Sequence, residues 1–251
     1  MGQTQSSDAS PGNEAAPSRS ASPPEEGWVR IVCISDTHGK HADLGDVPDG
    51  DVLIHAGDYT TFGKEVHARA FNEWLGTLPH PHKLVVNGNH EANAPWQLYA
   101  AEILSNATLL RNEHVEVQGL RVFGLDWSYP ISPESMTPPA YDKIPADVDV
   151  LVCHGPVADS QVDHGKGCRK LQELVRRTKP KCVVSGHIHT ARGTAASRGT
   201  RFVNAAVCGA GRAKRAVVNG AVVVDVPVSP APRGIAPFLL GTSSPVVVGG
   251  I

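Results

Sequence analysis

The stretch VRIVCISDTH, residues 29–38, joins an apolar run directly to a polar loop that carries Asp36 and His38. Val and Ile are enriched in strands, so residues 29–34 are predicted to form one. Loops at the carboxyl ends of strands are where α/β proteins place their ligands, and this Asp and His can face the same cavity. By itself the motif is weak, because an Asp just after a strand is more often a turn or helix-cap residue.

Similar apolar runs recur along the chain, and each is predicted to be a strand. They occupy residues 52–55, 84–86, 120–124, 148–153, 181–184, 201–203 and 221–226. One helical pattern between them places six apolar side chains on one face: Val66, Ala70, Phe71, Trp74, Leu75 and Leu78. A second pattern, marked by Leu171, Leu174 and Val175, ends before Pro180. We therefore expect an α/β fold, a layered α/β/β/α sandwich with two mixed β-sheets and a metal site in loops at the strand C-termini.

Length and composition set the domain organisation. The chain has 251 residues, of which 41% are hydrophobic and 19% charged, enough for one domain with a sizeable core. We assign this domain to residues 28–226. Residues 1–27 are rich in Ser, Pro, Gln and Ala without hydrophobic periodicity, so disorder is expected there. Residues 227–251 are a Pro/Gly-rich C-terminal extension.

Charge and cysteine content narrow the class of protein. The formal net charge is −2, from 23 basic and 25 acidic residues, and no Lys/Arg run is dense enough to follow the phosphates of duplex nucleic acid. Five Cys residues without a C-x-x-C pair indicate reduced thiols and a cytoplasmic location. No apolar stretch is long enough to be a transmembrane segment. Gly2 and Ser6 match the N-myristoylation pattern, but no second signal accompanies them, so any membrane association would be weak.

Four more polar loops directly follow predicted strands. They contain, in chain order, Asp58, Asn89 with His90, His154, and His187 with His189. Each has a structural alternative, since Gly-Asp and Asn-Gly favour turns and a lone His is usually a hydrogen-bonded core residue. The pair in SGHIH, residues 185–189, is the most specific, because side chains two apart in an extended segment face the same side. Six other His residues lack such settings and are expected to be solvated: His41, His67, His80, His82, His114 and His164.

The five loops together favour a metal centre, because all five structural alternatives would otherwise have to hold at once. With His90 set apart, they supply three carboxylate or amide oxygens and four imidazoles, a mixed shell suited to two divalent metal ions, Mn²⁺ first and Fe or Zn²⁺ as alternatives. Two ions about 3.5–4 Å apart clamp the attacking and leaving oxygens of an in-line displacement.

In this order, D-x-H, G-D, G-N-H-E, H and G-H-x-H resemble the signature of the calcineurin-like metallophosphoesterases, from about residue 29 to 225. Three further segments, CISDTH (33–38), FNEWLG (71–76) and VNA (203–205), resemble the metallophosphoesterase-domain-containing branch. That branch is related to class III cyclic nucleotide phosphodiesterases. Some of its members replace the first His of G-H-x-H by Gly, whereas His187 is present here.

The resemblance implies two sets of metal ligands that share Asp58. One set is Asp36, His38, Asp58 and His189; the other is Asp58, Asn89, His154 and His187. It also implies that Asp58 and His90 are catalytic and that Asn89 and His90 contact the substrate. Water activated between the two ions would attack phosphorus, while His90 stabilises the transition state or protonates the leaving oxygen.

Departures from the protein serine/threonine phosphatases of the same superfamily bear on the substrate. Those enzymes carry G-D-x-x-D-R-G and an Arg before G-N-H-E, whereas residues 57–63 here read GDYTTFG and Asn87 takes the second position. Fewer Arg clamps suit a phosphodiester, which has less charge to neutralise than a monoester dianion. We expect a cyclic nucleotide or another small diester as substrate. A phosphomonoesterase acting on nucleotides or small phosphates, and a catalytically weak metal-stabilised scaffold or binding protein, are the alternatives.

Overall fold

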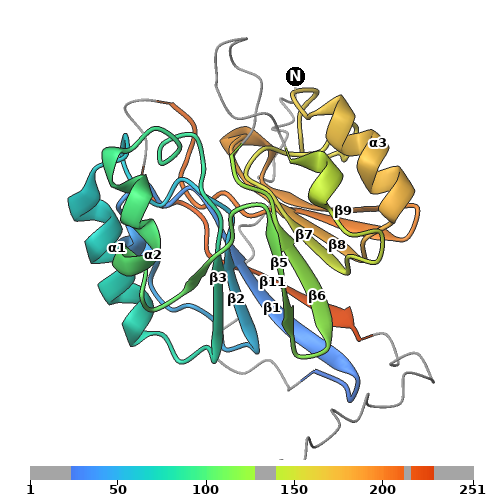
Figure 1. The fold of residues 1–251 in the computed structure, drawn as a ribbon, viewed down its shortest axis with the longest axis horizontal. Coiled ribbons are helices and arrows are strands. Elements are labelled where there is room, and N and C mark those ends of the chain that lie inside the picture. Colours follow the sequence, from blue (N-terminus) through green and yellow to red (C-terminus); the bar gives the residue numbers. More distant parts are fainter. Residues whose placement is uncertain (1–23, 128–139, 212–215, 229–251) are drawn as a thin grey trace, which may run out of the picture.

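Two β-sheets pack face to face, with α1 and α2 outside one sheet and α3 outside the other (Figure 1). The computed structural model describes residues 24–127, 140–211 and 216–228. The first sheet has the order β11-β1-β2-β3-β4 and consists of β1 (Trp28–Ile34), β2 (Val52–His55), β3 (His82–Val85), β4 (Thr108–Leu109) and β11 (Val222–Pro227). The second has the order β5-β6-β7-β8-β10-β9 and consists of β5 (Glu113–Val117), β6 (Leu120–Gly124), β7 (Val150–Val152), β8 (Cys182–Ser185), β9 (Gly193–Ser197) and β10 (Thr200–Asn204). The predicted α/β/β/α sandwich is confirmed.

The helices of the described residues are short. The α-helices are α1 (Glu65–Thr77), α2 (Ala100–Ile103) and α3 (Arg169–Thr178). Four 3₁₀ turns occupy His41–Leu44, Pro95–Tyr99, Tyr141–Lys143 and His189–Ala191. No helix in these parts of the chain is both long and apolar enough to cross a membrane.

The core has three layers, because the central strands are apolar on both faces. In β1, Ile31 and Cys33 belong to the cluster between the sheets, while Val32 and Ile34 belong to the cluster under α1 and α2. This alternation follows from the two-residue period of a strand. A third cluster joins the outer face of the second sheet to α3 through Leu171, Leu174 and Val175. Burial on both faces explains why these strands read as unbroken apolar runs.

The direction of the strands brings the polar loops to one edge. β1, β2, β3 and β4 run parallel, as do β6, β7, β8 and β10, while β11, β5 and β9 are antiparallel to their neighbours. Both sheets are therefore mixed, as expected. The carboxyl ends of the parallel strands in each sheet meet at one edge, which is where α/β proteins collect ligands.

The predicted strands were incomplete, and the predicted buried face of the first helix was partly wrong. The strands β4, β5 and β9 were not predicted; each lies at the edge of a sheet, where solvent replaces one neighbour and the apolar pattern fades. In α1, Val66 and Ala70 are exposed, and the buried face is Ala68, Phe71 and Leu75.

The solvated assignment failed for two histidines. His41 and His80 are buried, and His41 packs against Phe71 with ring centroids 5.6 Å apart. The domain boundaries stay predictions, since most of the 1–27 segment and of the 227–251 extension lies outside the described residues.

Candidate metal centre

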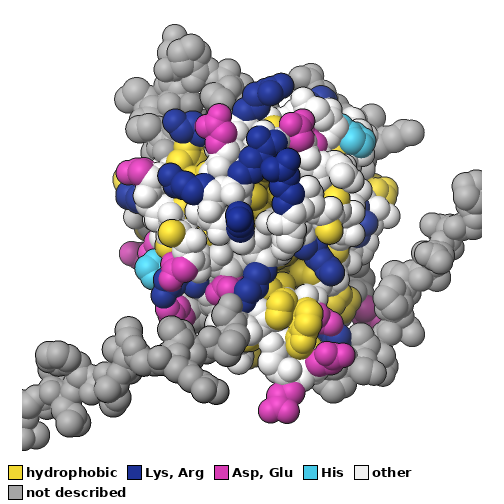
Figure 2. Space-filling view, turned by 90° about the vertical axis from the view of Figure 1, so that its right-hand side faces the viewer, with side chains coloured by type: hydrophobic (Ala, Val, Ile, Leu, Met, Phe, Trp, Pro, Cys, Tyr) yellow, Lys and Arg dark blue, Asp and Glu magenta, His cyan; other side chains and the backbone are white. Residues whose placement is uncertain are grey.

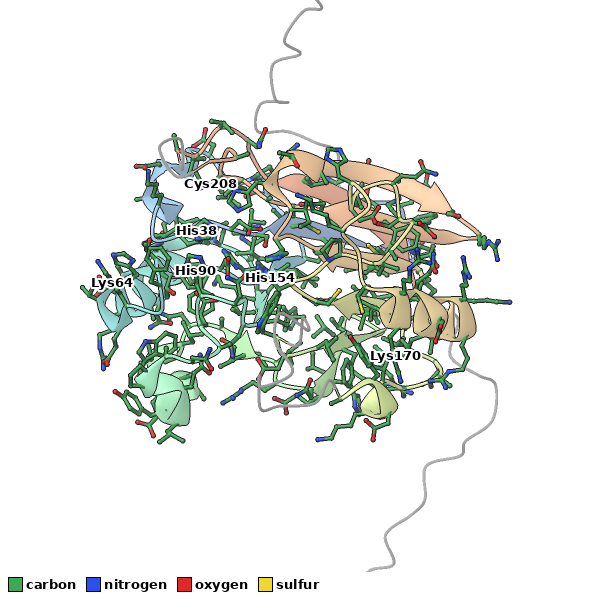
Figure 3. The ribbon with its side chains drawn as sticks, turned by 90° about the horizontal axis from the view of Figure 1, so that it is seen from above. His38, Lys64, His90, His154, Lys170 and Cys208 are labelled. Carbon is green, nitrogen blue, oxygen red and sulfur yellow. The ribbon has the colours of Figure 1, made fainter. Side chains whose placement is uncertain are left out.

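The five polar loops meet at one end of the molecule. The loop after β1 carries Asp36 and His38, the loop after β2 carries Asp58, and those after β3, β7 and β8 carry the remaining candidates: Asn89, His90, His154, His187 and His189. Figure 3 looks down on this end and places His38, His90 and His154 close together, between Lys64 and Lys170. The structure therefore brings all the sequence-predicted site residues together.

Asp36, His38 and His189 form the first group of potential ligands. His189 Nε2 lies 3.1 Å from Asp36 Oδ1 and 3.2 Å from His38 Nε2. The potential ligand atoms of the three residues all lie within 4.8 Å of one another. One cation placed among them would contact two nitrogens and a carboxylate oxygen.

Asp58, His154 and His187 form the second group, with their ligand atoms within 4.8 Å of one another. Asp58 Oδ2 lies 3.4 Å from His154 Nε2 and 3.9 Å from His38 Nε2, so this oxygen stands between the two groups. Asn89 Oδ1 lies 3.0 Å from His187 Nδ1. Asp58 has the position expected of a carboxylate shared by two ions.

Backbone carbonyls orient two of the imidazoles. His154 Nδ1 lies 2.7 Å from Ala56 O, and His189 Nδ1 lies 3.0 Å from Gly209 O, so each Nδ1–H donates to a carbonyl. Each Nε2 then faces the centre, the orientation typical of metal-binding histidines. His154 Nε2 is fully buried and has no hydrogen-bond partner in the described residues. A buried ring nitrogen that faces the carboxylates of Asp36 and Asp58 can exchange its proton for a cation.

The loop backbones are strained at the candidate ligands. Asp36, His38, Asp58 and His187 have φ values of 58°, 47°, 57° and 66°, in the left-handed region. A non-glycine residue held there costs about 1–3 kcal/mol and persists only where the surroundings enforce it. Such strain at four of the seven candidate ligands is characteristic of a functional site.

Two glycines permit the loops to approach closely. A Cβ at Gly88 would lie 2.2 Å from Asp58 Oδ1, and one at Gly186 would lie 2.2 Å from Asp36 Oδ2. Neither distance is sterically possible without movement of the carboxylate. The glycines of the G-N-H-E and G-H-x-H motifs are thus required by packing against the carboxylates that they face.

Burial and neighbouring charges shift the pKa values of the site. Burial would raise the pKa of Asp36, but His154 above all outweighs it and holds the pKa well below its usual range. Burial would lower the pKa of His154, but Asp58 and Asp36 raise it to about 9. Burial lowers the pKa of both His38 and His187 to about 4. Two carboxylates and two neutral imidazoles at neutral pH form a donor set that suits a divalent cation.

Comparison with known proteins also indicates a phosphoesterase. The family model for calcineurin-like phosphoesterases matches residues 29–191. The chain belongs to the calcineurin-like phosphoesterase family. A UPF0046 protein of Caenorhabditis elegans is 36% identical, covering 85% of this chain and 86% of that protein. Metallophosphoesterase domain-containing protein 1 of Homo sapiens is 33% identical, covering 82% of this chain and 73% of that protein. One solved structure, at 16% identity, aligns with a TM-score of 0.58 and covers 70% of this chain and 90% of the solved one, which shows a shared fold.

Members of this family depend on divalent metal ions, and the residues present fit that requirement. The mixed oxygen and nitrogen donors, the position of Asp58 and the buried Nε2 of His154 all suit cations.

Glu91 supports the phosphoesterase site, a role that sequence reasoning missed. One carboxylate oxygen accepts from the backbone N–H groups of Asp58 and Gly88 at 2.9 Å, and the other accepts from the N–H and hydroxyl of Thr60 at 2.8 and 2.6 Å. Burial, and then the charge of Asp58, raise the pKa of Glu91 to about 7 despite these bonds. Glu91 therefore ties the loop after β2 to the loop after β3. The sequence feature that could have indicated this role is the position of Glu91 directly after Asn89 and His90 in one polar run.

His55 and Trp127 were also missed. His55 is buried; its Nδ1 accepts from Gly57 N–H at 3.2 Å, so its Nε2–H donates to Thr37 Oγ1 at 3.0 Å. The Trp127 ring packs against His154 and His187 with centroids 5.2 and 5.1 Å apart. His55 is the polar end of an otherwise apolar strand, a pattern that could have marked it as a support.

His90 lies beside the two groups of potential ligands, and its tautomer is defined by a hydrogen bond. Phe62 N–H donates to His90 Nδ1 at 2.8 Å, so a neutral ring carries its proton on Nε2. His90 Nε2 lies 3.8 Å from Asp58 Oδ2, and its ring is 4.6 Å from that of His38. With His38 and Asp58 it forms a third potential ligand group, so proximity alone does not separate ligand from proton donor.

Proposed function

We propose that this phosphoesterase hydrolyses a phosphodiester, a cyclic nucleotide or another small diester, with two divalent ions, Mn²⁺ first and Fe or Zn²⁺ as alternatives. The observation that carries the proposal is the position of Asp58 Oδ2 between His154 Nε2 at 3.4 Å and His38 Nε2 at 3.9 Å. One ion would be held by Asp36, His38, Asp58 and His189, the other by Asp58, Asn89, His154 and His187. Such an ion pair polarises phosphoryl oxygens and lowers the pKa of water.

The chain's own residues would then orient the substrate and supply a proton. Asn89 and His90 are adjacent in the loop after β3 and would contact the phosphate. Because Phe62 N–H donates to His90 Nδ1, a neutral His90 carries its proton on Nε2, the atom that would donate to a leaving oxygen or to a phosphoryl oxygen. We assign His90 as the general acid rather than a ligand.

The setting of Asn87 supports a diester over a protein phosphomonoester. Its side chain is buried, accepts from Tyr59 Oη at 2.9 Å and donates to Asp126 Oδ1 at 2.9 Å. This amide is committed to the fold and brings no positive charge to the phosphate. A substrate with a single negative charge on phosphorus needs less neutralisation than a dianion.

Paired substrates test the proposal. The full chain, stripped with chelator and reloaded with Mn²⁺, Fe²⁺ or Zn²⁺, would be assayed on cyclic nucleotides, a nitrophenyl diester, a nitrophenyl monoester and nucleoside monophosphates. We expect kcat/KM to be higher for diesters than for monoesters and to vanish without metal. Monoester preference would instead establish the phosphomonoesterase. Full metal occupancy without turnover on any of these would establish a scaffold.

We also propose that the protein is cytoplasmic and that any membrane contact depends on Gly2 acylation, although residues 1–23 lie outside the described part of the chain. Mass analysis of the N-terminus after expression in a myristoylating host decides the matter. An unmodified Gly2 would remove the idea of acylation.

A further inference from the structure

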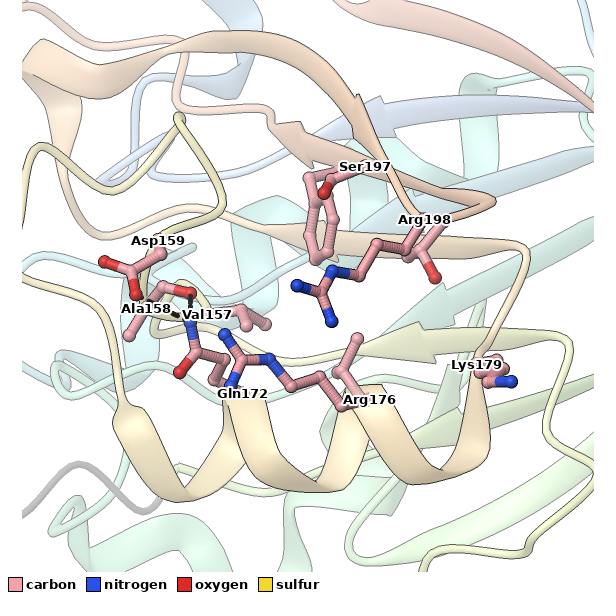
Figure 4. Close-up of a pocket in the computed structure, with 11 residues that line it drawn as sticks. Val157, Ala158, Asp159, Gln172, Arg176, Lys179, Ser197 and Arg198 are labelled. Carbon is pink, nitrogen blue, oxygen red and sulfur yellow. Dashed lines mark hydrogen bonds between the residues drawn. The ribbon is translucent and has the colours of Figure 1, made fainter.

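A second cavity lies between α3 and the hairpin formed by β9 and β10 (Figure 4). Its volume is about 460 Å³, within the range of about 300–1,000 Å³ usual for small-molecule sites. The walls carry three cations, Arg176, Lys179 and Arg198, and apolar side chains that include Val175 and Phe202. Neither the metal ions nor the catalytic groups proposed above involve these residues.

The hairpin end of the cavity, where Arg198 lies, is remote from the candidate metal centre. Thr200, which lines it, is the first residue of β10, whereas Asn204, the last, donates to Ile188 O at 3.0 Å between His187 and His189. Four strand steps of about 3.3 Å separate the two ends by roughly 13 Å. A ligand held by Arg198 at the hairpin would not reach the metal ligands.

The charge of this part of the chain differs from that of the whole. Residues 169–201 contain nine Lys or Arg residues and one acidic residue, Glu173, in a chain whose net charge is −2. The nine are Arg169, Lys170, Arg176, Arg177, Lys179, Lys181, Arg192, Arg198 and Arg201. Figure 2 views the side of the molecule that carries α3 and shows Lys and Arg side chains gathered on its upper half. Anions are attracted to such a face.

Among the residues that the structure describes, Arg176 and Arg198 have no anionic partner. Figure 4 shows both guanidinium groups directed into the space between helix and hairpin. Within the described ranges neither side chain takes part in a hydrogen bond or ion pair. The one carboxylate lining the cavity, Asp159, accepts instead from Gln172 Nε2 at 2.8 Å. Two like charges facing one space leave their donors available to an anion.

The backbone holds two of these cations in an unusual conformation. Arg198 has a φ of 53° and is followed by Gly199 at 85°, so both central residues of the two-residue hairpin turn have positive φ. Such turns favour Asn-Gly or Gly-Gly, and Arg is not among the residues that adopt this conformation readily. Lys179 has a φ of 49° at the C-cap of α3, where Gly is usual. Each strained position thus carries a cation at the edge of the cavity.

We propose that this cavity binds a small organic phosphate, with its phosphate between Arg176 and Arg198 and its apolar part against Val175 and Phe202. The planar guanidinium group matches the oxygens of a phosphate in a bidentate manner. The apolar side chains would contact the organic part of the ligand, which inorganic phosphate lacks. The volume admits one small molecule, which favours this ligand over a polymer.

Titrations followed at the methyl resonances of Val175 test the proposal on the full, Zn²⁺-loaded protein. The probes are phenylphosphonate, which has no ester bond to hydrolyse, inorganic phosphate, and uncharged benzyl alcohol. We expect phenylphosphonate to bind about tenfold or more tightly than either partial probe, because each lacks one half of the interaction.

Matched variants distinguish a specific binding site in the cavity from nonspecific attraction of anions to a positively charged surface. R176Q combined with R198N should raise the dissociation constant of phenylphosphonate by about tenfold or more, whereas R177Q, in the same turn of α3 but outside the cavity, should leave it within about twofold. R198N alone suits the turn and should fold normally, as a thermal unfolding midpoint will show. An equal loss in R177Q, no shift at Val175, or equal binding of benzyl alcohol would each overturn the proposal.

Discussion

The candidate metal centre and the cavity beside α3 use polar side chains in opposite ways. In the metal centre they are buried or half-buried and held by the chain itself, as when Ala56 O fixes His154 and Glu91 binds the loop of Asp58. Beside α3, Arg176 and Arg198 are exposed and have no ion pair in the described residues. The first arrangement is preorganised, as catalysis requires; the second leaves its donors for a ligand to order.

Removal of Asp58 should have the largest effect, because Asp58 stands between both groups of ligands. Asp58→Ala should lower kcat/KM by about 10³-fold or more and reduce the bound metal, as measured by elemental analysis. Asp159→Ala, at the other cavity, is the matched control and should change neither. An Asp58→Ala protein that keeps its metal and its activity would contradict the bridging position.

Removal of His90 should separate proton transfer from metal binding. General acid catalysis contributes about 10²–10⁴-fold, and more for a basic leaving oxygen. His90→Ala should therefore slow cyclic nucleotide hydrolysis far more than nitrophenyl diester hydrolysis, with metal content unchanged. His114→Ala, an exposed histidine on β5, is the control.

Two other results would reassign His90. Equal slowing of both substrates would make it a stabiliser of phosphoryl oxygens, since the basicity of the leaving oxygen would no longer matter. A loss of metal would make it a ligand, as its place in the third group allows.

The pH dependence of metal binding should report the charge on His154. In the metal-free protein its pKa is raised to about 9, so between pH 7 and 9 an entering ion must displace a proton. Affinity should rise by about tenfold per pH unit for that proton and level off above pH 9. Calorimetry in buffers of different ionisation enthalpy counts the proton released. A flat profile in wild type, or an unchanged slope in His154→Asn, would contradict this reading.

The sequence was most informative where burial on two faces leaves an unbroken apolar run. It predicted β1 and β2 and the loop residues that follow them, because a polar residue after such a run is conspicuous. It could not predict β5 or β9, whose solvent-facing edges permit the mixed segments EHVEV and GTAAS.

The residues that support the metal centre could not be predicted from the sequence for a different reason. Glu91 and His55 act through bonds to backbone groups distant in sequence, such as Thr60 N–H for Glu91, and no local pattern encodes those partners. The burial of His41 and His80 likewise depends on elements that meet only in the fold, as the packing of His41 on Phe71 shows. The cavity beside α3 was missed because its cations are spread over residues 176–198 and form no dense run.

The smallest predicted effect concerns strain at the edge of that cavity. Arg198 adopts a φ of 53° in a turn that favours Asn-Gly. R198N should therefore stabilise the protein by about 0.5–1 kcal/mol in urea unfolding while it weakens anion binding, since left-handed backbone penalises Arg more than Asn. R177N, inside α3, should instead destabilise by roughly 0.5 kcal/mol through helix propensity. Stability gained as binding is lost would mean that the hairpin keeps a strained residue for the sake of a ligand. If R198N were less stable than wild type, Arg198 would be serving the fold, and the strain would not support a binding role.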